Sequence, residues 1–123
     1  MNVVDSSAWL EYFTGGPRAD FFAQAIEDGS HLLVPAIALY EVFKKVLSEK
    51  GEGEALKAVA QMKTGQVVEM TENIALGAAK ISLEHKMPLA DSVMLATAKL
   101  YNAKLWTQDE HFKNIEGVIY KKK

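Results

Sequence analysis

The chain has 123 residues, 49% of them hydrophobic and 24% charged, and this length and composition predict one globular domain over residues 1–123. It contains no cysteine, which excludes disulfide bonds and thiolate metal sites. The net charge of −2 excludes nucleic-acid binding through bulk positive charge, so RNA or DNA would need a local basic cluster or bridging metal ions.

The sequence indicates neither an N-terminal targeting signal nor a membrane span. The N-terminus has no basic region followed by an apolar run, and no segment is apolar over the length of a membrane span. We therefore expect a cytoplasmic protein with no membrane partner. The lysines at 121–123 are one candidate basic cluster, although such a terminal run is more typical of a solvated, frayed end.

Short apolar runs rich in β-branched residues alternate with segments of helical periodicity along the chain. The expected strands are residues 2–4, 31–34, 66–70, 104–107 and 118–120. The expected helices are residues 8–13, 17–26, 36–50, 55–63, 71–86, 88–101 and 109–114. This alternation predicts right-handed crossovers, and with them an α/β fold in which helices cover both faces of a central, mostly parallel five-stranded sheet.

Two aspartates follow expected strands. Asp5 comes directly after strand 2–4, and Asp109 comes just after strand 104–107. The carboxyl ends of parallel strands meet at one edge of a sheet, where ligands bind in open α/β folds. We therefore expect both carboxylates at the same edge. Taken alone, however, Asp5 is more typical of a residue that caps the N-terminus of the following helix.

Two further acids lie in helices. Glu41 is the only charge in the apolar first half of helix 36–50, and a buried carboxylate costs several kcal/mol unless it is paired, protonated or bound to a cation. Helical spacing fits two interpretations equally: an exposed strip that continues through Lys44 and Lys45, or a polar pocket. Asp91 opens helix 88–101 just after Pro88.

If Glu41 and Asp91 reach the edge that holds Asp5, four carboxylates crowd a small volume and cannot all stay ionised without cations. Mg²⁺ and Mn²⁺ prefer oxygen ligands, and such ions activate water and stabilise charge in phosphodiester hydrolysis. Ser6 and Thr107 stand next to two of these acids and are candidates to hold them by hydrogen bonds.

The order and spacing of these motifs resemble the PIN-domain ribonucleases, and most closely the VapC-type toxins of toxin–antitoxin pairs. The motifs are Val4-Asp5-Ser6-Ser7, Glu41 within an apolar helix, Pro88-x-x-Asp91-Ser92 and Trp106-Thr107-x-Asp109-x-x-Phe112. The resemblance covers nearly the whole chain. It implies a PIN-like three-layer α/β/α sandwich and hydrolysis of single-stranded or looped RNA that depends on Mg²⁺ or Mn²⁺.

The same resemblance implies roles for single residues. Asp5 and Asp91 would be the principal metal ligands, and Glu41 and Asp109 would complete a catalytic and metal-binding acidic site. Thr107 would steady the chain near Asp109, and Ser6 would support Asp5 in the same way.

The resemblance also implies partners, namely a homodimeric mate and a cognate antitoxin protein whose tail lies in a groove. Large apolar residues such as Trp9, Phe22 and Tyr40 are candidates for the wall of that groove, although they are also typical of an ordinary core.

Two other function classes compete with a nuclease. A receiver-type phosphoacceptor domain needs paired acids after an early strand and an acceptor aspartate after the third, whereas this chain has a single Asp5 and then Met70-Thr71 at those places. A non-catalytic PIN-like module that binds RNA or a protein partner stays open, and the presence of all four acids weighs against it.

Overall fold

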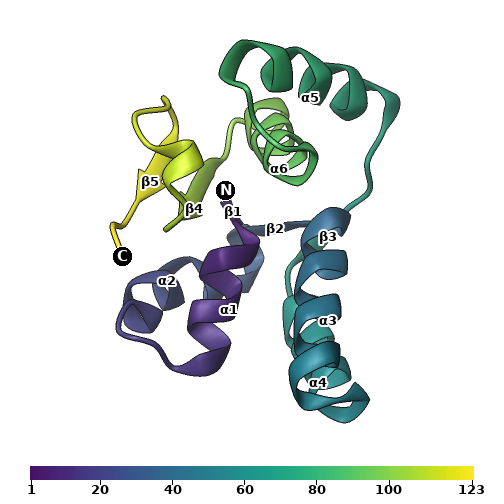
Figure 1. The fold of residues 1–123 in the computed structure, drawn as a ribbon, viewed down its shortest axis with the longest axis vertical. Coiled ribbons are helices and arrows are strands. Elements are labelled where there is room, and N and C mark those ends of the chain that lie inside the picture. The colour runs from purple at the N-terminus through teal and green to yellow at the C-terminus, as the bar shows by residue number, and fades with distance from the viewer.

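A five-stranded sheet lies at the centre of the computed structural model, which describes residues 1–123 (Figure 1). Its strands are β1 (Asn2–Val4), β2 (Leu32–Pro35), β3 (Gln66–Val68), β4 (Lys104–Thr107) and β5 (Val118–Tyr120). They lie in the order β3-β2-β1-β4-β5, and every neighbouring pair is parallel. The predicted α/β class is therefore confirmed, with a sheet that is parallel throughout.

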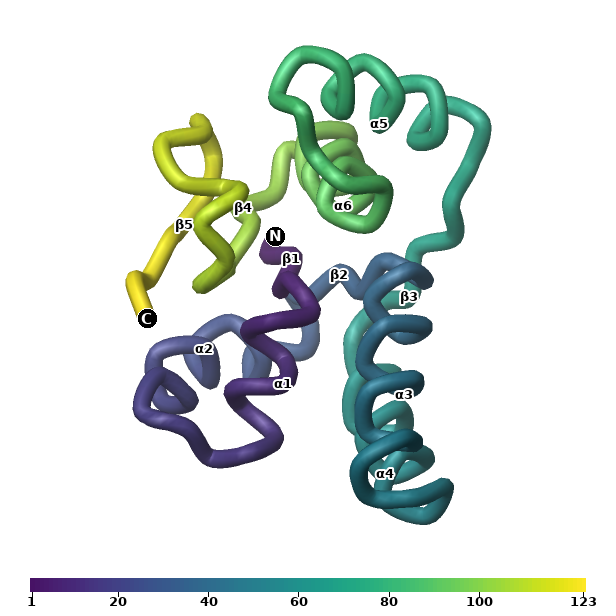
Figure 2. Tube along the Cα trace, in the orientation of Figure 1, coloured from purple at the N-terminus to yellow at the C-terminus, as the bar shows by residue number.

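Helices cover both faces of this sheet. The α-helices are α1 (Ser6–Thr14), α2 (Ala19–Ile26), α3 (Ala36–Lys50), α4 (Glu52–Met62), α5 (Glu72–His85) and α6 (Leu89–Leu100), and η1 (Gly29–His31) and η2 (Glu110–Phe112) are short 3₁₀ turns. Figures 1 and 2 show α1 and α2 on one side of the strands, α5 and α6 on the other, and α3 and α4 as a projecting helical hairpin. This is the predicted three-layer sandwich. No helix combines the length and hydrophobicity that a bilayer crossing requires.

Element boundaries differ from the sequence predictions at three places. His31 belongs to η1 rather than to β2. The strand expected to reach residue 70 stops at Val68, where its neighbour β2 stops at Pro35, a residue with no N–H to continue the ladder. The helix expected over 109–114 is only the three-residue turn η2, and the chain then bends through Asn114 in the left-handed conformation, with φ of 65°.

The core is one cluster of 27 buried apolar residues on both faces of the sheet. Strand residues such as Val3, Leu33 and Leu105 are fully buried, as expected for a parallel sheet between two helical layers. Trp9 and Phe22 are also fully buried, so they belong to the core and the interpretation of them as groove residues is wrong.

The direction in which strands are added reverses next to β1. Strands β2 and β3 extend the sheet on one side of β1, whereas β4 and β5 extend it on the other. Such a switch point opens a crevice outside the carboxyl ends of the two strands that flank it, here β1 and β4. Val4 pairs with Trp106 in this register, and the amide of Asp5 donates to the carbonyl of Trp106 at 2.9 Å. Asp5 and Thr107 therefore lie side by side at this crevice.

Candidate active site

Asp5 is a buried carboxylate at the carboxyl end of β1, with only 2% of its surface exposed. Its side chain makes no capping hydrogen bond to α1, so the N-cap interpretation is wrong. Ser7 Oγ and Thr107 Oγ1 instead donate to Asp5 Oδ2 at 2.7 and 3.0 Å. Burial raises the pKa of Asp5 to about 6; the two hydroxyls oppose this shift, and the charges of Asp91 and Asp109 add to it.

The hydroxyl of Thr107 links Asp5 to the segment that carries Asp109. Thr107 is fully buried, and its Oγ1, which donates to Asp5, also accepts from the amide of Asp109 at 2.9 Å. Asp109 Oδ1 in turn accepts from the amide of His111 at 2.9 Å and so caps η2. One threonine thus fixes the relative positions of the acids that follow β1 and β4.

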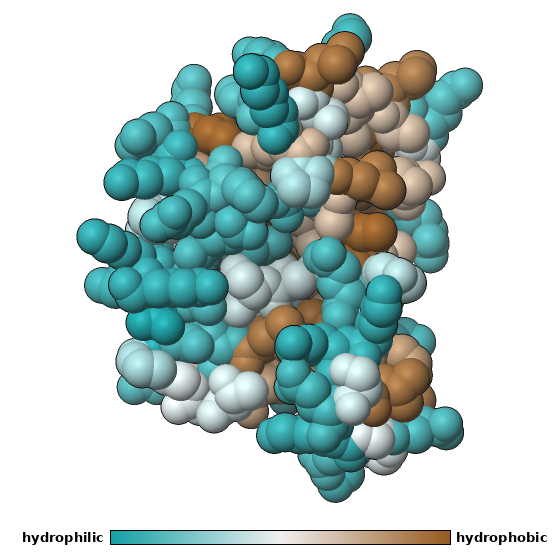
Figure 3. All heavy atoms as spheres, in the orientation of Figure 1, coloured by the Kyte–Doolittle hydropathy of each residue, from teal (hydrophilic) through white to brown (hydrophobic).

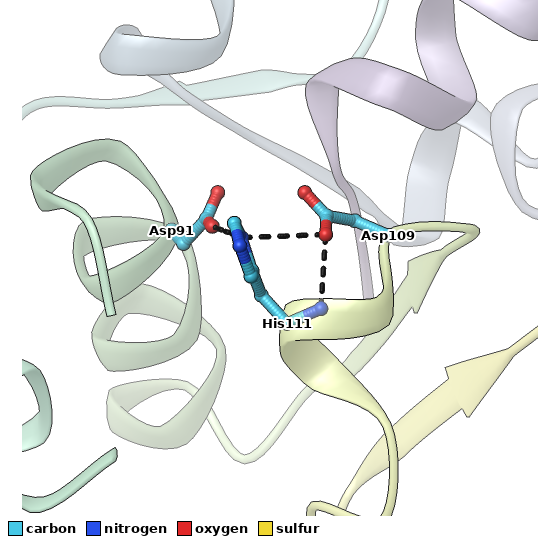
Figure 4. Close-up of side chains that lie close together, drawn as sticks. All are labelled: Asp91, Asp109 and His111. Atoms are coloured by element: carbon cyan, nitrogen blue, oxygen red, sulfur yellow. Dashed lines mark hydrogen bonds and ion pairs between the residues drawn. The ribbon is translucent and has the colours of Figure 1, made fainter. Parts of the chain in front are cut away.

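Asp91 enters from the other helical layer, in the first turn of α6, and is 9% exposed. Its Oδ2 lies 2.6 Å from His111 Nδ1 (Figure 4). The pKa of Asp91 is raised, mainly by burial; the hydrogen bond from His111 opposes this rise, whereas the charges of Asp109 and Glu41 add to it.

Glu41 is half-buried on α3, and Ser6 Oγ donates to its Oε1 at 2.7 Å. The two lysines that were expected to share a polar strip with it are engaged elsewhere: Lys44 Nζ donates to Tyr40 Oη at 3.4 Å, and Lys45 pairs with Glu49 at 2.9 Å. Glu41 is therefore directed toward α1 by Ser6, and its charge acts on Asp91.

The structure brings the four predicted acids to the same end of the sheet, but not all equally close. Asp91, Asp109 and His111 each offer one ligand atom within 4.8 Å of the other two, and Figure 4 shows their side chains converging from α6 and η2. Asp5 and Glu41 lie outside that tight group. Asp5 is linked to Asp109 through hydrogen bonds of the Thr107 hydroxyl. The negative charge of Glu41 contributes to the raised pKa of Asp91.

His111 is the site residue that sequence reasoning missed. It lies two positions after Asp109, a spacing at which a tight turn returns the side chain over the preceding carboxylate. The sequence analysis predicted a regular helix over 109–114. In a regular helix, residues two apart point in different directions, so that prediction gave no reason to place His111 near Asp109.

A second polar network holds the ends of β4 and α1 together behind these acids. Gln108 Oε1 accepts from Arg18 Nε at 2.7 Å, and Gln108 Nε2 donates to the carbonyl of Ser7 at 3.4 Å. Arg18 Nη2 lies 3.0 Å from Glu11 Oε2. The one arginine of this region is thus neutralised by Glu11 rather than by the acids of the crevice.

These contacts allow a test of whether the residues suit a divalent cation. No lysine or arginine forms an ion pair with any of the four acids, and the only cationic partner among the ion pairs is His111, with Asp91 and Asp109. Burial is the largest cause of the raised pKa values of Asp5 and Asp91, and His111 opposes it only at Asp91. An oxygen-rich set that lacks positive charge fits Mg²⁺ or Mn²⁺.

Comparison with known proteins agrees with this arrangement. The family model described as PIN domain matches residues 3–118. A toxin–antitoxin complex from Klebsiella pneumoniae contains a chain 25% identical to this one, with a TM-score of 0.80 over 97% of this chain and 96% of that one. No curated protein matches the sequence.

Two more solved structures share the fold at lower identity. VapC20 of Mycobacterium tuberculosis, described as a Sarcin-Ricin loop cleaving toxin, is 16% identical, with a TM-score of 0.79 over 96% of this chain and 97% of that one. VapBC-1 from nontypeable Haemophilus influenzae is 17% identical, with a TM-score of 0.75 over 98% and 96%. The resemblance predicted from the motifs is confirmed.

The raised pKa of Asp5 predicts how stability depends on pH in the absence of metal. The folded state holds the proton to about pH 6 whereas the unfolded chain releases it near 3.8, so the free energy of unfolding falls as pH rises through this window. Asn keeps the shape and the two hydroxyl contacts without the charge. Asp5→Asn should therefore be more stable than the parent at pH 7.5, by roughly 3 kcal/mol at most.

Urea denaturation in EDTA measures this difference. We expect the gain to shrink below about 1 kcal/mol near pH 4, where the parent carboxyl is protonated in the folded state. Asp20→Asn, at an exposed position on α2, is the matched control and should show no such pH dependence. An Asp5→Asn protein less stable than the parent at pH 7.5 would contradict the raised pKa.

Proposed function

The chain belongs to the PIN domain family, and from that membership we propose that it is a metal-dependent endoribonuclease that acts as the toxin of a toxin–antitoxin pair. The observation that carries the proposal is the convergence of Asp5, Asp91, Asp109 and Glu41 at the switch point between β1 and β4. Family membership also removes the receiver-type alternative, since that is a different fold family.

The acids would hold Mg²⁺ or Mn²⁺ through their oxygens, with Asp5 and Asp91 as principal ligands and with Glu41 and Asp109 completing the set. A bound divalent cation supplies Lewis-acid chemistry for phosphodiester hydrolysis and offsets the repulsion among the carboxylates. Ser6 and Thr107 would orient two of these carboxylates through the hydrogen bonds described above.

The C-terminal lysines support an RNA substrate. Because β5 is parallel to β4, residues 121–123 emerge at the edge that holds the acids, and the amide of Lys121 donates to the carbonyl of Thr107 at 2.9 Å. Lys121 Nζ also lies 5.2 Å above the ring of Phe21. The run is therefore anchored at its start rather than frayed.

A pocket of about 370 Å³ lies between Lys122 and Lys123 and the acidic residues Asp109 and Glu110. Phosphates bound by these lysines would pass beside the acids.

An antitoxin partner is supported by the solved relatives and by a pocket that has both apolar and charged residues in its wall. The Klebsiella and Haemophilus structures are described as toxin–antitoxin and VapBC assemblies. In this chain a pocket of about 210 Å³ lies between α1 and the α3–α4 hairpin, with Leu10, Phe13 and Val46 in its wall. Such a pocket suits an apolar side chain of a partner segment.

We also propose that residues 1–123 form one domain, that the protein is cytoplasmic and that it is a homodimer. Exposed apolar side chains support the homodimer. They gather over α5 and α6, toward the upper right of Figure 3, and include Met70, Leu76, Leu83 and Leu89, which are 52 to 85% exposed. Burying such side chains between two copies would favour association.

RNA cleavage tests the enzymatic proposal. Purified protein should cut single-stranded RNA with Mg²⁺ or Mn²⁺ and leave it intact in EDTA. Asp5→Asn and Asp91→Asn should each slow cutting by about a hundredfold or more, since even residues behind metal ligands change affinity or activity by 10–100-fold. Asp20→Asn should cut like the parent. If the two site variants cut at the parental rate, the site assignment is wrong.

RNA affinity tests the lysines. In an Asp91→Asn background with EDTA, so that no RNA is consumed, Lys122→Gln/Lys123→Gln should weaken binding of a labelled single strand. Each lost phosphate contact should reduce the slope of log affinity against log salt by about 0.7. Lys44→Gln/Lys45→Gln, on α3 and engaged with Tyr40 and Glu49, is the charge-matched control. An unchanged salt slope in the terminal double variant would refute this path for RNA.

Bacterial growth tests the toxin role. Expression of the chain should arrest growth, and Asp91→Asn should not, because arrest would follow from RNA cleavage. Co-expression of a small DNA-binding protein encoded immediately upstream of the gene should relieve the arrest. Arrest by the Asp91→Asn variant would point instead to a module that acts by binding alone.

A further inference from the structure

His111 places a ring nitrogen between two carboxylates of the proposed metal site. Its Nδ1 lies 2.6 Å from Asp91 Oδ2 and 3.3 Å from Asp109 Oδ1 (Figure 4). The side chain is 55% exposed, so it is not fixed in this position by core packing. Nothing in the motifs assigns this residue a part in the site.

In the absence of metal, a protonated imidazole accounts for both contacts, because its positive charge attracts both carboxylates. Nδ1 carries at most one hydrogen, and the short contact with Asp91 uses it. The contact with Asp109 is then electrostatic, and a cation that took the place of the proton would meet the same three atoms. His31 provides the comparison within this chain: its Nδ1 lies 3.0 Å from Asp28 Oδ1 on the surface, and no second carboxylate forms an ion pair with it.

The three atoms are spaced as ligands of one ion. Ligands at about 2.1 Å from an octahedral divalent cation and at right angles to each other lie about 3 Å apart. The two contacts of Nδ1, at 2.6 and 3.3 Å, fall on either side of that value, and all three ligand atoms lie within 4.8 Å of one another. Small shifts of an exposed ring would admit the ion.

We propose that His111 Nδ1 is a ligand of the divalent cation, beside Asp91 Oδ2 and Asp109 Oδ1, and that this nitrogen makes the site prefer Mn²⁺ over Mg²⁺. The preference follows from ligand chemistry, since Mg²⁺ selects oxygen whereas imidazole favours transition ions. The inference rests on the proposed function for the presence of a cation at these acids, but it does not depend on cleavage.

Metal binding by the whole chain tests the inference without an activity assay. Calorimetric titration of the parent with Mn²⁺ and with Mg²⁺ gives the ratio of the two affinities. His111→Ala should weaken Mn²⁺ binding by about 10–100-fold and Mg²⁺ binding by less than about threefold. His111→Gln, which substitutes an amide oxygen, should restore binding without restoring the preference. His31→Ala removes an imidazole from the other His–Asp contact and should change neither affinity.

A spectroscopic measurement detects the bond itself. The electron spin echo of bound Mn²⁺ should show modulation from a directly bound nitrogen in the parent and in His31→Ala, and should lose it in His111→Ala. Equal changes in the affinities of both ions, or no nitrogen modulation in the parent, would overturn the inference while leaving a metal-dependent nuclease intact. A parent that binds neither ion would overturn the proposed function as well.

Discussion

The carboxylate of Asp5 is held in a buried position where β1 and β4 end together, and the rest of the site follows from that constraint. Its nearest charged neighbours include two other acids, and the hydroxyls of Ser7 and Thr107 offset only part of the cost of burial, so its pKa stays near 6. Unlike a surface acid, it cannot reach solvent to be hydrated. A cation in the crevice is the partner that would make the ionised form favourable.

Apart from the contact of His111 with Asp91, neutral hydroxyls and a backbone amide position the acids. Thr107 holds Asp5 and the amide of Asp109, and Ser6 holds Glu41. The single arginine of the chain, Arg18, is bound by Glu11 and Gln108 instead. A hydroxyl orients a carboxylate but does not neutralise it. The hydroxyls of Ser6 and Thr107 therefore fix the positions of Glu41 and Asp5 without offsetting their negative charge.

The parallel sheet explains why residues so far apart in sequence meet. The strand order reverses at β1. The connections that follow β1 and β4 therefore lead away from each other, and a crevice opens between the carboxyl ends of these two strands. The same topology carries the end of β5, and with it the terminal lysines, to this edge. A parallel arrangement thus places acids and basic residues side by side, as a nuclease acting on a polyanion would require.

The sequence by itself determined the fold class, the alternation of strands and helices, and the four acids, because hydrophobic periodicity and motif spacing are local properties of the chain. Only the tertiary structure decided that Asp5 is no helix cap, that Ser6 holds Glu41, that Trp9 and Phe22 are core and that residues 121–123 begin with an anchored lysine. It alone revealed His111, whose contact with Asp91 joins residues 20 positions apart. Each of these outcomes depends on a neighbour that a different element supplies, and periodicity within one element carries no information about that neighbour.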